Sequence, residues 1–409
     1  VAAVRTASTV KGYHNNIKDY QGILDGFKRF RVVEAQREKE KEMLSSLQAD
    51  PEAAAEFSVL LEEFKTLHER QAEHRKKDLV LAYLVGQSTL LEEAMLLYRW
   101  SVEKEKRDMD REPEFMERRV PDLRRDLDVF QTQMHLGSER AILKMLFLEA
   151  AQLPEGQRIA ALDAVLGSKS ASELEEAVDV FLDGLYAGTK LDRREERLRM
   201  FGLSREAFLA ESDAFVTLSG RLYAENQERL ERRKEFSGAE QLLMLKWMKA
   251  LAGASDRELY ADANGTMRFS YGNVKGYSPR DAVEYVPFTT LEGVVEKNTG
   301  AEPFDCPQKI LELAAEREYG QYADPGLGSV AVNLLTTNDS TRGNSGSPVL
   351  NSKGEVVGCL FDGNYEGLGH DFAFHEEVTR SIHVDIRYVL WVADLVDDAE
   401  NVLRELGVK

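Results

Sequence analysis

The chain has 409 residues, of which 43% are hydrophobic and 31% charged, and at roughly 150 residues per domain this composition suits a folded protein of two to three domains. Lys and Arg number 53 against 72 Asp and Glu, so the formal net charge of -19 argues against a general nucleic-acid binder and a protein held on an anionic membrane surface. No stretch approaches the roughly 20 apolar residues of a membrane-spanning helix. Cys306 and Cys359 could form one disulfide, but two cysteines exclude a disulfide scaffold and a structural zinc site.

The first part of the chain, to about residue 260, is expected to be helical. It holds only four of the ten prolines and is dense in Leu, Ala, Glu, Lys and Arg. Ser172 and Glu175 form a capping box ahead of apolar residues at helical spacing, and Gly188 follows as a stop signal. A second capping box, Ser237 with Glu240, predicts another helix start. Further long helices are expected over 20–48, 52–78, 87–118, 120–151 and 204–235.

After about residue 262 Gly and β-branched residues become frequent and apolar runs shorten, which predicts strands. Residues 351–354 are typical of a hairpin turn, and residues 389–406 return to helical spacing as a terminal helix. A helical part followed by a β-rich part predicts an α+β protein with two domains, 1–262 and 263–409. The expected strands are 266–271, 331–336, 348–350, 355–361 and 371–374.

The sharpest local motif is the string GNSGSP at 343–348, directly before an expected strand. A serine between small residues on a tight turn can present its hydroxyl outward and let a substrate carbonyl approach the backbone. The N–H groups of Gly343 and Ser345 could then hold one oxyanion, which predicts Ser345 as a nucleophile that still needs a base and an orienting residue. The competing interpretation is a Gly-rich hairpin turn, and the complete string before a strand favours the nucleophile.

This string resembles the nucleophile loop of chymotrypsin-like serine peptidases. The second residue there is usually an Asp that pairs with a new N-terminal amine on activation, whereas this chain has the neutral Asn344, so activation by that ion pair is not expected. Further segments resemble the bacterial dipeptidyl-peptidase 7/11 family, whose members remove dipeptides from peptide N-termini. These segments are 15–22, 262–268, 271–272, 274–277, 287–293, 361–364 and 381–388.

The resemblance implies a chymotrypsin-like double β-barrel with a large helical domain inserted in it. The family's catalytic His and Asp come from an N-terminal barrel ahead of the insert, and this chain begins at Val1, with no initiator Met, near where the insert begins. We therefore expect an excised or processed piece, with a substrate-gating helical domain followed by a C-terminal barrel half that carries the nucleophile and ends in a helix. The resemblance also implies a homodimer and a periplasmic or secreted location in a Gram-negative bacterium, and no cofactor is expected.

None of the seven histidines is expected to replace the absent base, since four lie in the helical half and three follow Ser345, out of the family's order. We interpret each as a surface or packing residue. Nothing fixes a metal geometry around His370 with Asp371 or His375 with Glu376, so no metal site is predicted. The histidines are His14, His68, His74, His135, His370, His375 and His383.

An exopeptidase must recognise a free α-amine, and a buried ammonium needs a carboxylate and amide oxygens as acceptors. Asp362 follows Ser345 at the end of the strand expected to line the substrate cleft, and the matching Asp of the family holds the amine. Asn15 matches a family Asn that does the same from the helical domain. The competing interpretations are a turn Asp before Gly363 and a helix N-cap at Asn15.

Two residues give opposing expectations for the P1 side chain, which precedes the scissile bond. At the position of Gly363, family members with Arg suit acidic P1 side chains, while Gly leaves an open apolar pocket and implies a hydrophobic or broad preference. The family usually has Gly where this chain has Arg342, and in chymotrypsin-like folds that residue borders the S1 pocket. A cation at this rim could attract acidic substrates, so the P1 preference stays open.

We therefore expect a serine-type dipeptidyl aminopeptidase that acts on peptides with a free N-terminus, with Ser345 as nucleophile and with His and Asp supplied by an N-terminal barrel absent from this chain. The alternative is a helical partner-binding or scaffold protein with an inactive β-domain; a His- and Asp-bearing segment in the same particle would argue against it. A cysteine-dependent enzyme using Cys359 is disfavoured, because Gly358 and Leu360 offer no base.

Overall fold

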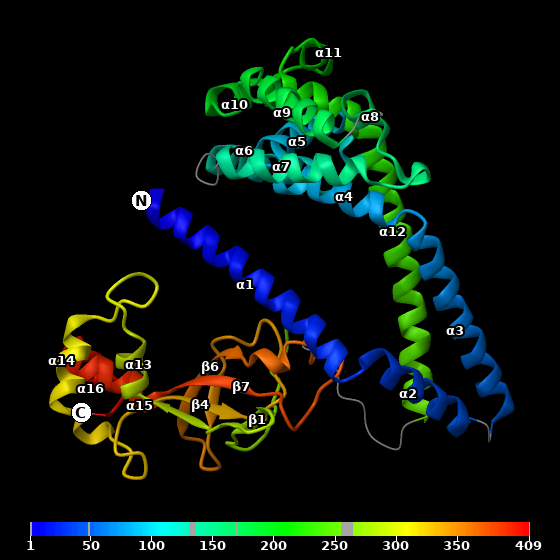
Figure 1. Cartoon of the computed structure of the whole chain (residues 1–409). Helices are drawn as coiled ribbons and strands as arrows, with labels where there is room; N and C mark the ends of the chain where they lie inside the picture. Colours follow the sequence, from blue (N-terminus) through cyan, green and yellow to red (C-terminus); the bar gives the residue numbers. More distant parts are fainter. Residues whose placement is uncertain (1, 48–49, 131–135, 168–170, 255–264, 409) are drawn as a thin grey trace. The chain divides into compact units, whose positions relative to one another are not determined.

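A computed structural model describes residues 2–47, 50–130, 136–167, 171–254 and 265–408. The chain divides into two compact units, Ser46–Glu258 and Val1–Ser45 with Leu259–Lys409. The first unit is helical and the second combines antiparallel sheet with helices, which confirms the α+β prediction (Figure 1). The junction predicted at 262 lies close to the one found, but residues 1–45 group with the β-rich unit and not with the helical one.

Side-chain caps start two helices of the helical unit, α3 and α5. Asp50 Oδ1 accepts hydrogen bonds from the amides of Glu52 and Ala53, both at 3.1 Å, ahead of α3. Ser88 Oγ accepts one from Leu91 N at 3.3 Å ahead of α5, and both contacts satisfy amides that have no acceptor within the helix. The α-helices of this unit are α3 (Pro51–Ala72), α4 (Arg75–Gln87), α5 (Thr89–Glu103), α6 (Val120–Val129), α7 (Leu136–Ala151), α8 (Ala160–Leu166), α9 (Ala171–Ala187), α10 (Arg194–Gly202), α11 (Arg205–Leu209) and α12 (Ala214–Ala254).

The core of this unit forms around α5, whose buried Leu91 and Leu97 belong to one apolar cluster with Phe215 of α12. Farther along α12, the ring of Trp247 packs 5.5 Å from that of Phe57 on α3, and the two helices lie side by side (Figure 1). Among the described residues no single helix has the length and apolar composition of a membrane span; α4 and α5, which meet at 97°, reach it only when taken together.

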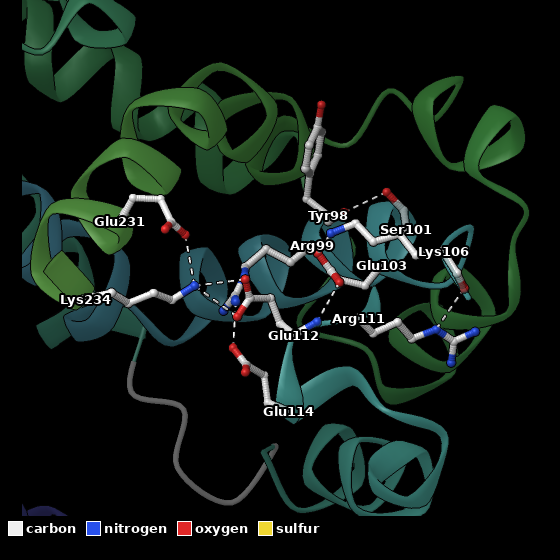
Figure 2. Close-up of polar contacts among 10 residues, drawn as sticks. All are labelled: Tyr98, Arg99, Ser101, Glu103, Lys106, Arg111, Glu112, Glu114, Glu231 and Lys234. Atoms are coloured by element: carbon white, nitrogen blue, oxygen red, sulfur yellow. Dashed lines mark hydrogen bonds and ion pairs between the residues drawn. The ribbon is translucent and has the colours of Figure 1, made fainter. Parts of the chain in front are cut away.

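The segment after α5 departs from the helix predicted over 87–118, because α5 ends at Glu103. The Glu103 carboxylate accepts a hydrogen bond from Glu112 N at 2.9 Å, and Arg99 Nη2 pairs with Glu114 Oε1 at 2.6 Å (Figure 2). These contacts return the chain to α5 through short 3-10 turns in place of a longer helix. The turns are Asp108–Asp110, Pro113–Phe115 and Glu117–Arg119.

Other helix predictions have mixed outcomes. The helix that stops before Gly188 is confirmed as α9, while the side chain of Ser172 lies outside the described residues. The start predicted by Ser237 and Glu240 is wrong, since both lie inside the unbroken α12, where amides bond to the preceding turn and need no cap. The helix predicted over 20–48 breaks at Arg31, which adopts a positive φ of 48°.

The β-rich unit contains an antiparallel sheet with strand order β3-β4-β7-β6-β5, and β1 and β2 form a separate hairpin. Within the described residues the edge strands β3 and β5 are not paired with each other, so the expected barrel half is an open sheet here. The strands are β1 (Tyr277–Arg280), β2 (Val283–Tyr285), β3 (Phe288–Thr290), β4 (Ala331–Thr336), β5 (Pro348–Leu350), β6 (Val356–Gly363) and β7 (Ser381–Asp385).

Three strand predictions are confirmed as β4, β5 and β6, with β6 extending two residues further than expected. The strand predicted over 371–374 is wrong, because the amides of Phe372 and Ala373 both donate to Gly369 O at 3.1 Å and form a turn. The strand over 266–271 is also wrong: among the described residues, the chain before β1 pairs with the sheet only through a single bridge, Val274 to Thr336.

Helices cover one end of the sheet around an apolar cluster that includes Leu291, Val330 and the fully buried Trp391. Trp391 Nε1 donates to Glu318 O at 2.9 Å, so its one polar group is satisfied. The predicted terminal helix over 389–406 is broken by a π-helical segment, Val392–Val396, and by Asp398 at a φ of 52°. The helices are α13 (Leu291–Lys297), α14 (Gln308–Glu316), α15 (Ile386–Trp391) and α16 (Glu400–Glu405).

The N-terminal helices α1 (Ala2–Arg29) and α2 (Val32–Ser46) precede the helical unit, and α1 packs closely on the turn after β6. Gly22 permits this approach, since a Cβ there would lie 2.4 Å from Leu368 Cδ1. Gly26, one helical turn further, faces Gly369, where a Cβ would make an ordinary contact 3.8 Å from Gly369 Cα. A hydrogen bond from the Tyr365 hydroxyl to an Asp25 oxygen, at 2.9 Å, fixes the same contact. This packing explains why the N-terminal residues belong to the β-rich unit.

We predict that Gly276→Ala destabilises the β-rich unit. A Cβ there would lie 2.1 Å from the backbone oxygen of Tyr285, so the β1–β2 hairpin would have to shift. Overpacking of this kind typically costs about 1–3 kcal/mol. The matched control is Gly293→Ala in α13, where a Cβ meets nothing within 4 Å and helix propensity favours Ala. Chemical denaturation should show a lower free energy of unfolding only for Gly276→Ala; equal values for the two variants would contradict the close packing.

Candidate active site

The loop before β5 holds Ser345 on a turn whose shape depends on glycine. Gly343 and Gly346 have φ angles of +93° and +91°, a region that disfavours residues with a side chain. Gly346 N donates to Leu360 O at 2.7 Å, and Leu360 N donates to Ser347 O at 2.9 Å, which joins the end of the loop to β6. The hydroxyl of Ser345 is exposed and lies 3.5 Å from Phe361 O.

The same loop leaves two amides available. Among the described residues, neither Gly343 N nor Ser345 N donates to a protein acceptor. The side chain of Asn344 is used within the loop, where its Oδ1 accepts a hydrogen bond from Thr341 N at 2.8 Å. The loop therefore offers a hydroxyl and two N–H groups to a ligand at one turn, which is the donor set that an acyl-transfer site requires.

Asp362 lies at the end of β6, beside this loop. The pairing of β6 with β7 shifts register between Leu360 and Asp362, and such a bulge re-aims side chains next to it. Leu360 is buried while Asp362 is exposed, although regular alternation would place both on one face. Asp362 Oδ1 accepts the amide of Gly363 at 2.8 Å, and its other oxygen has no hydrogen bond within the described part of the chain.

A buried polar network fixes the chain directly after Asp362. Asn364 Nδ2 donates to Val378 O at 2.7 Å, and Asn364 Oδ1 accepts from Arg380 N at 2.8 Å. The Tyr277 hydroxyl donates to a Glu366 oxygen at 2.8 Å, and burial raises the pKa of Tyr277. Each of these contacts holds a residue of the β6–β7 connection, which begins shortly after Asp362. These hydrogen bonds therefore fix the backbone that follows Asp362.

Asn15 lies inside α1 and is exposed, so the N-cap interpretation is wrong. Positions 15, 19, 22 and 26 recur at helical spacing and share one face of α1. Gly22 and Gly26 on that face pack on the turn after β6, and Asp19 pairs with Arg342. Asn15 therefore extends the contact face of α1 by one turn beyond Asp19.

Arg342 is not a free cation. Its guanidinium pairs with Asp19, and this carboxylate raises the pKa of Arg342 further above its ordinary value. The neighbouring Thr341 Oγ1 donates to Asp371 Oδ1 at 2.6 Å. At Gly363 a Cβ would meet nothing closer than a backbone oxygen at 3.8 Å, so the missing side chain leaves open space.

No histidine contacts Ser345 among the described residues. His370 Nδ1 lies 2.5 Å from Gly367 O, and His375 stacks on Phe30 with ring centroids 3.6 Å apart. Burial lowers the pKa of His383 to about 4, so this side chain is neutral at pH 7. His14 and His68 are exposed, His74 is half-buried, and His135 lies outside the described residues.

The cysteines and acidic residues add no further site. Cys306 and Cys359 are both free thiols. Within the described ranges no group of three or more His, Cys, Asp or Glu side chains could hold a metal ion, although His370 Nε2 and Asp371 Oδ1 approach to 3.4 Å.

The chain belongs to the Peptidase S46 family, whose profile matches residues 2–408. It is 34% identical, over 99% of its length, to an Asp/Glu-specific dipeptidyl-peptidase of Shewanella putrefaciens, and 27% identical, again over 99%, to a dipeptidyl-peptidase 7 of Capnocytophaga gingivalis. It covers 58% and 55% of these two relatives, so it spans little more than half of their length.

A solved structure of Porphyromonas endodontalis DPP11 in complex with the dipeptide Arg-Glu matches 99% of this chain with a TM-score of 0.74 at 24% identity. This match covers 56% of that chain and supports the fold. The resemblance to the dipeptidyl-peptidase 7/11 family is thereby confirmed.

The sequence pointed to the loop and Asp362 as candidates but not to the residues that position them in the structure. Asp19 and Arg380 do so through contacts distant in sequence, which no local pattern shows. One signal was available for α1: Gly22 and Gly26 stand one turn apart in a long helix, a spacing that permits close packing on one face.

Proposed function

We propose that this chain is part of a serine-type dipeptidyl aminopeptidase that releases dipeptides from the free N-termini of peptides. The observation that carries the proposal is the placement of two exposed groups on adjoining segments. The hydroxyl of Ser345 lies against the carbonyl of Phe361, and the carboxylate of Asp362 belongs to the next residue. Family membership and the names of the relatives support the same reaction.

Ser345 is the proposed nucleophile. Its Oγ attacks the carbonyl carbon of the second substrate residue while the general base takes the hydroxyl proton, and the N–H groups of Gly343 and Ser345 hold the negative charge that develops on the carbonyl oxygen. The scissile C–N bond then breaks, the base returns the proton to the leaving amine, and water hydrolyses the acyl-enzyme to release the dipeptide. Neither amide has another acceptor among the described residues, which supports this role. No cofactor takes part in the proposed reaction.

Asp362 and Asn15 are the proposed partners of the substrate's α-ammonium group. A carboxylate provides the opposite charge and an amide oxygen a further acceptor. Two extended residues span about 7 Å, so an amine site next to the nucleophile limits the released product to a short N-terminal unit. The placement of Asn15 on the contact face of α1 supports its share in this site.

The general base and its orienting residue are proposed to be a His and an Asp of an N-terminal barrel outside residues 1–409, which would complete a chymotrypsin-like fold. The absence of a histidine at Ser345 among the described residues and the greater length of the relatives support this proposal.

We further propose a homodimer in the periplasm or outside the cell of a Gram-negative bacterium. Gly363 supports an apolar or broad P1 preference, whereas the Shewanella relative is named Asp/Glu-specific.

Replacing Ser345 by Ala in the complete enzyme should abolish turnover of dipeptidyl substrates, because loss of a triad nucleophile typically costs about a millionfold in rate. Covalent labelling by a serine-directed phosphonate should disappear as well. Ser352→Ala in the exposed β5–β6 turn serves as a control and should keep both properties. Turnover by Ser345→Ala that survives removal of contaminating peptidase would contradict the assignment.

A preparation that contains only residues 1–409 should be folded but inactive on dipeptidyl substrates, since it lacks the proposed base. Circular dichroism and a cooperative thermal transition would establish folding, and the complete enzyme in the same assay provides the positive control. Turnover by the isolated chain that depends on Ser345 would show that a histidine of this chain acts as base, and the proposed division of the catalytic residues would be wrong.

The complete enzyme should cleave a reporter dipeptide with a free amine and reject its N-acetylated form. Loss of one partner from a desolvated charge pair costs about 2–5 kcal/mol, so the ratio of kcat/KM values should be large. Asp362→Ala should lose activity chiefly on the free-amine substrate. Asp362→Asn is the matched variant, because it can keep the hydrogen bond to Gly363 N but removes the charge. If wild type treats both substrates alike, or if the ratio is unchanged in the variants, Asp362 is only a turn residue.

A further inference from the structure

Arg342 is the only charged residue between Thr341 and Ser347, so the charge of the nucleophile loop depends on this side chain. Its guanidinium pairs with Asp19 of α1. The Asp19 side chain is 22% exposed and the Arg342 side chain 71%. The carboxylate is therefore mostly buried, while the guanidinium is largely exposed to solvent.

Arg342 directly precedes Gly343, whose amide is a proposed oxyanion donor. The P1 side chain is attached to the Cα that is bonded to the attacked carbonyl carbon. Neighbouring Cα atoms along a chain are 3.80 Å apart. A long side chain one residue from the oxyanion donor can therefore reach the P1 side chain. A group that neutralises the charge of Arg342 therefore changes the electrostatic potential at the P1 side chain.

Asp19 is held in place by more than this one ion pair. Gly22 and Gly26 seat α1 on the turn after β6, and Asp25 accepts the Tyr365 hydroxyl at 2.9 Å. On the other side of the loop, Asp371 is bound to Thr341 Oγ1 at 2.6 Å. The charges of Asp19 and Asp371 both raise the pKa of Arg342, so two carboxylates act on the one cation of this loop.

We propose that Asp19 is a specificity-determining residue, which by pairing with Arg342 prevents that cation from recognising an acidic P1 side chain. This inference rests on the proposed dipeptidyl-peptidase function. It accounts for how a chain with an Arg beside its oxyanion donor keeps the apolar preference that Gly363 implies. It also makes α1, which carries Asn15, a determinant of the P1 preference.

The test compares two free-amine dipeptide reporters that differ only in P1, Leu against Glu, with the complete enzyme. Asp19→Asn should raise the Glu-to-Leu ratio of kcat/KM about fivefold, the size expected for one exposed ion pair. The gain should shrink at high salt. Arg342→Gln alone should leave the ratio near that of wild type, and the double variant should behave like Arg342→Gln.

Asp25→Asn is the matched control, because it removes the same charge from the same helix, its amide oxygen can still accept the Tyr365 hydroxyl, and it does not contact Arg342. It should leave the ratio unchanged, and thermal transitions should show that all variants fold. The proposal is overturned if Asp19→Asn and Asp25→Asn act alike, if the double variant keeps the gain, or if Arg342→Gln by itself lowers the use of Glu. Wild-type enzyme that cleaves neither reporter would overturn the proposed function itself, and this assignment with it.

Discussion

A buried guanidinium must find an acceptor for each of its N–H groups, and that of Arg380 finds them in backbone carbonyls. Arg380 is 1% exposed, and burial lowers its pKa from the ordinary value. Its side chain binds the loop before β1 and the loop before β7 at once, so two segments distant in sequence are fixed relative to each other. The carbonyl oxygens belong to Lys275, Gly276, Glu376, Glu377 and Thr379.

The candidate site depends on this arrangement. The amide of Arg380 binds Asn364, and Asn364 lies two residues after Asp362. Helix α1 also contacts the site: its Asp19 pairs with Arg342 of the loop that holds Ser345, and its Gly22 packs on the turn after β6. The loop of Ser345, the carboxylate of Asp362 and α1 therefore all belong to one compact unit.

The parts predictable from sequence were those set by local patterns. β-branched residues and short apolar runs predicted β4 and β5 with the observed bounds, and the GNSGSP string predicted a tight turn, which the structure shows to depend on glycine. The capping box at Ser237 failed because a local signal has no effect inside a helix whose preceding turn is already formed. The grouping of residues 1–45 with the sheet and the pairing of Arg342 with Asp19 were not predictable, since both depend on contacts more than 300 residues apart in sequence.

The central claim is that one site in this unit joins a serine nucleophile to recognition of a free amine. Peptide mapping of the complete enzyme after reaction with a dipeptidyl phosphonate tests both parts together, using the reagent with a free and with an acetylated N-terminus. The account predicts a covalent adduct on Ser345 with the free-amine reagent and little or none with the acetylated one. An adduct on another residue, or equal labelling of Ser345 by both reagents, would contradict it.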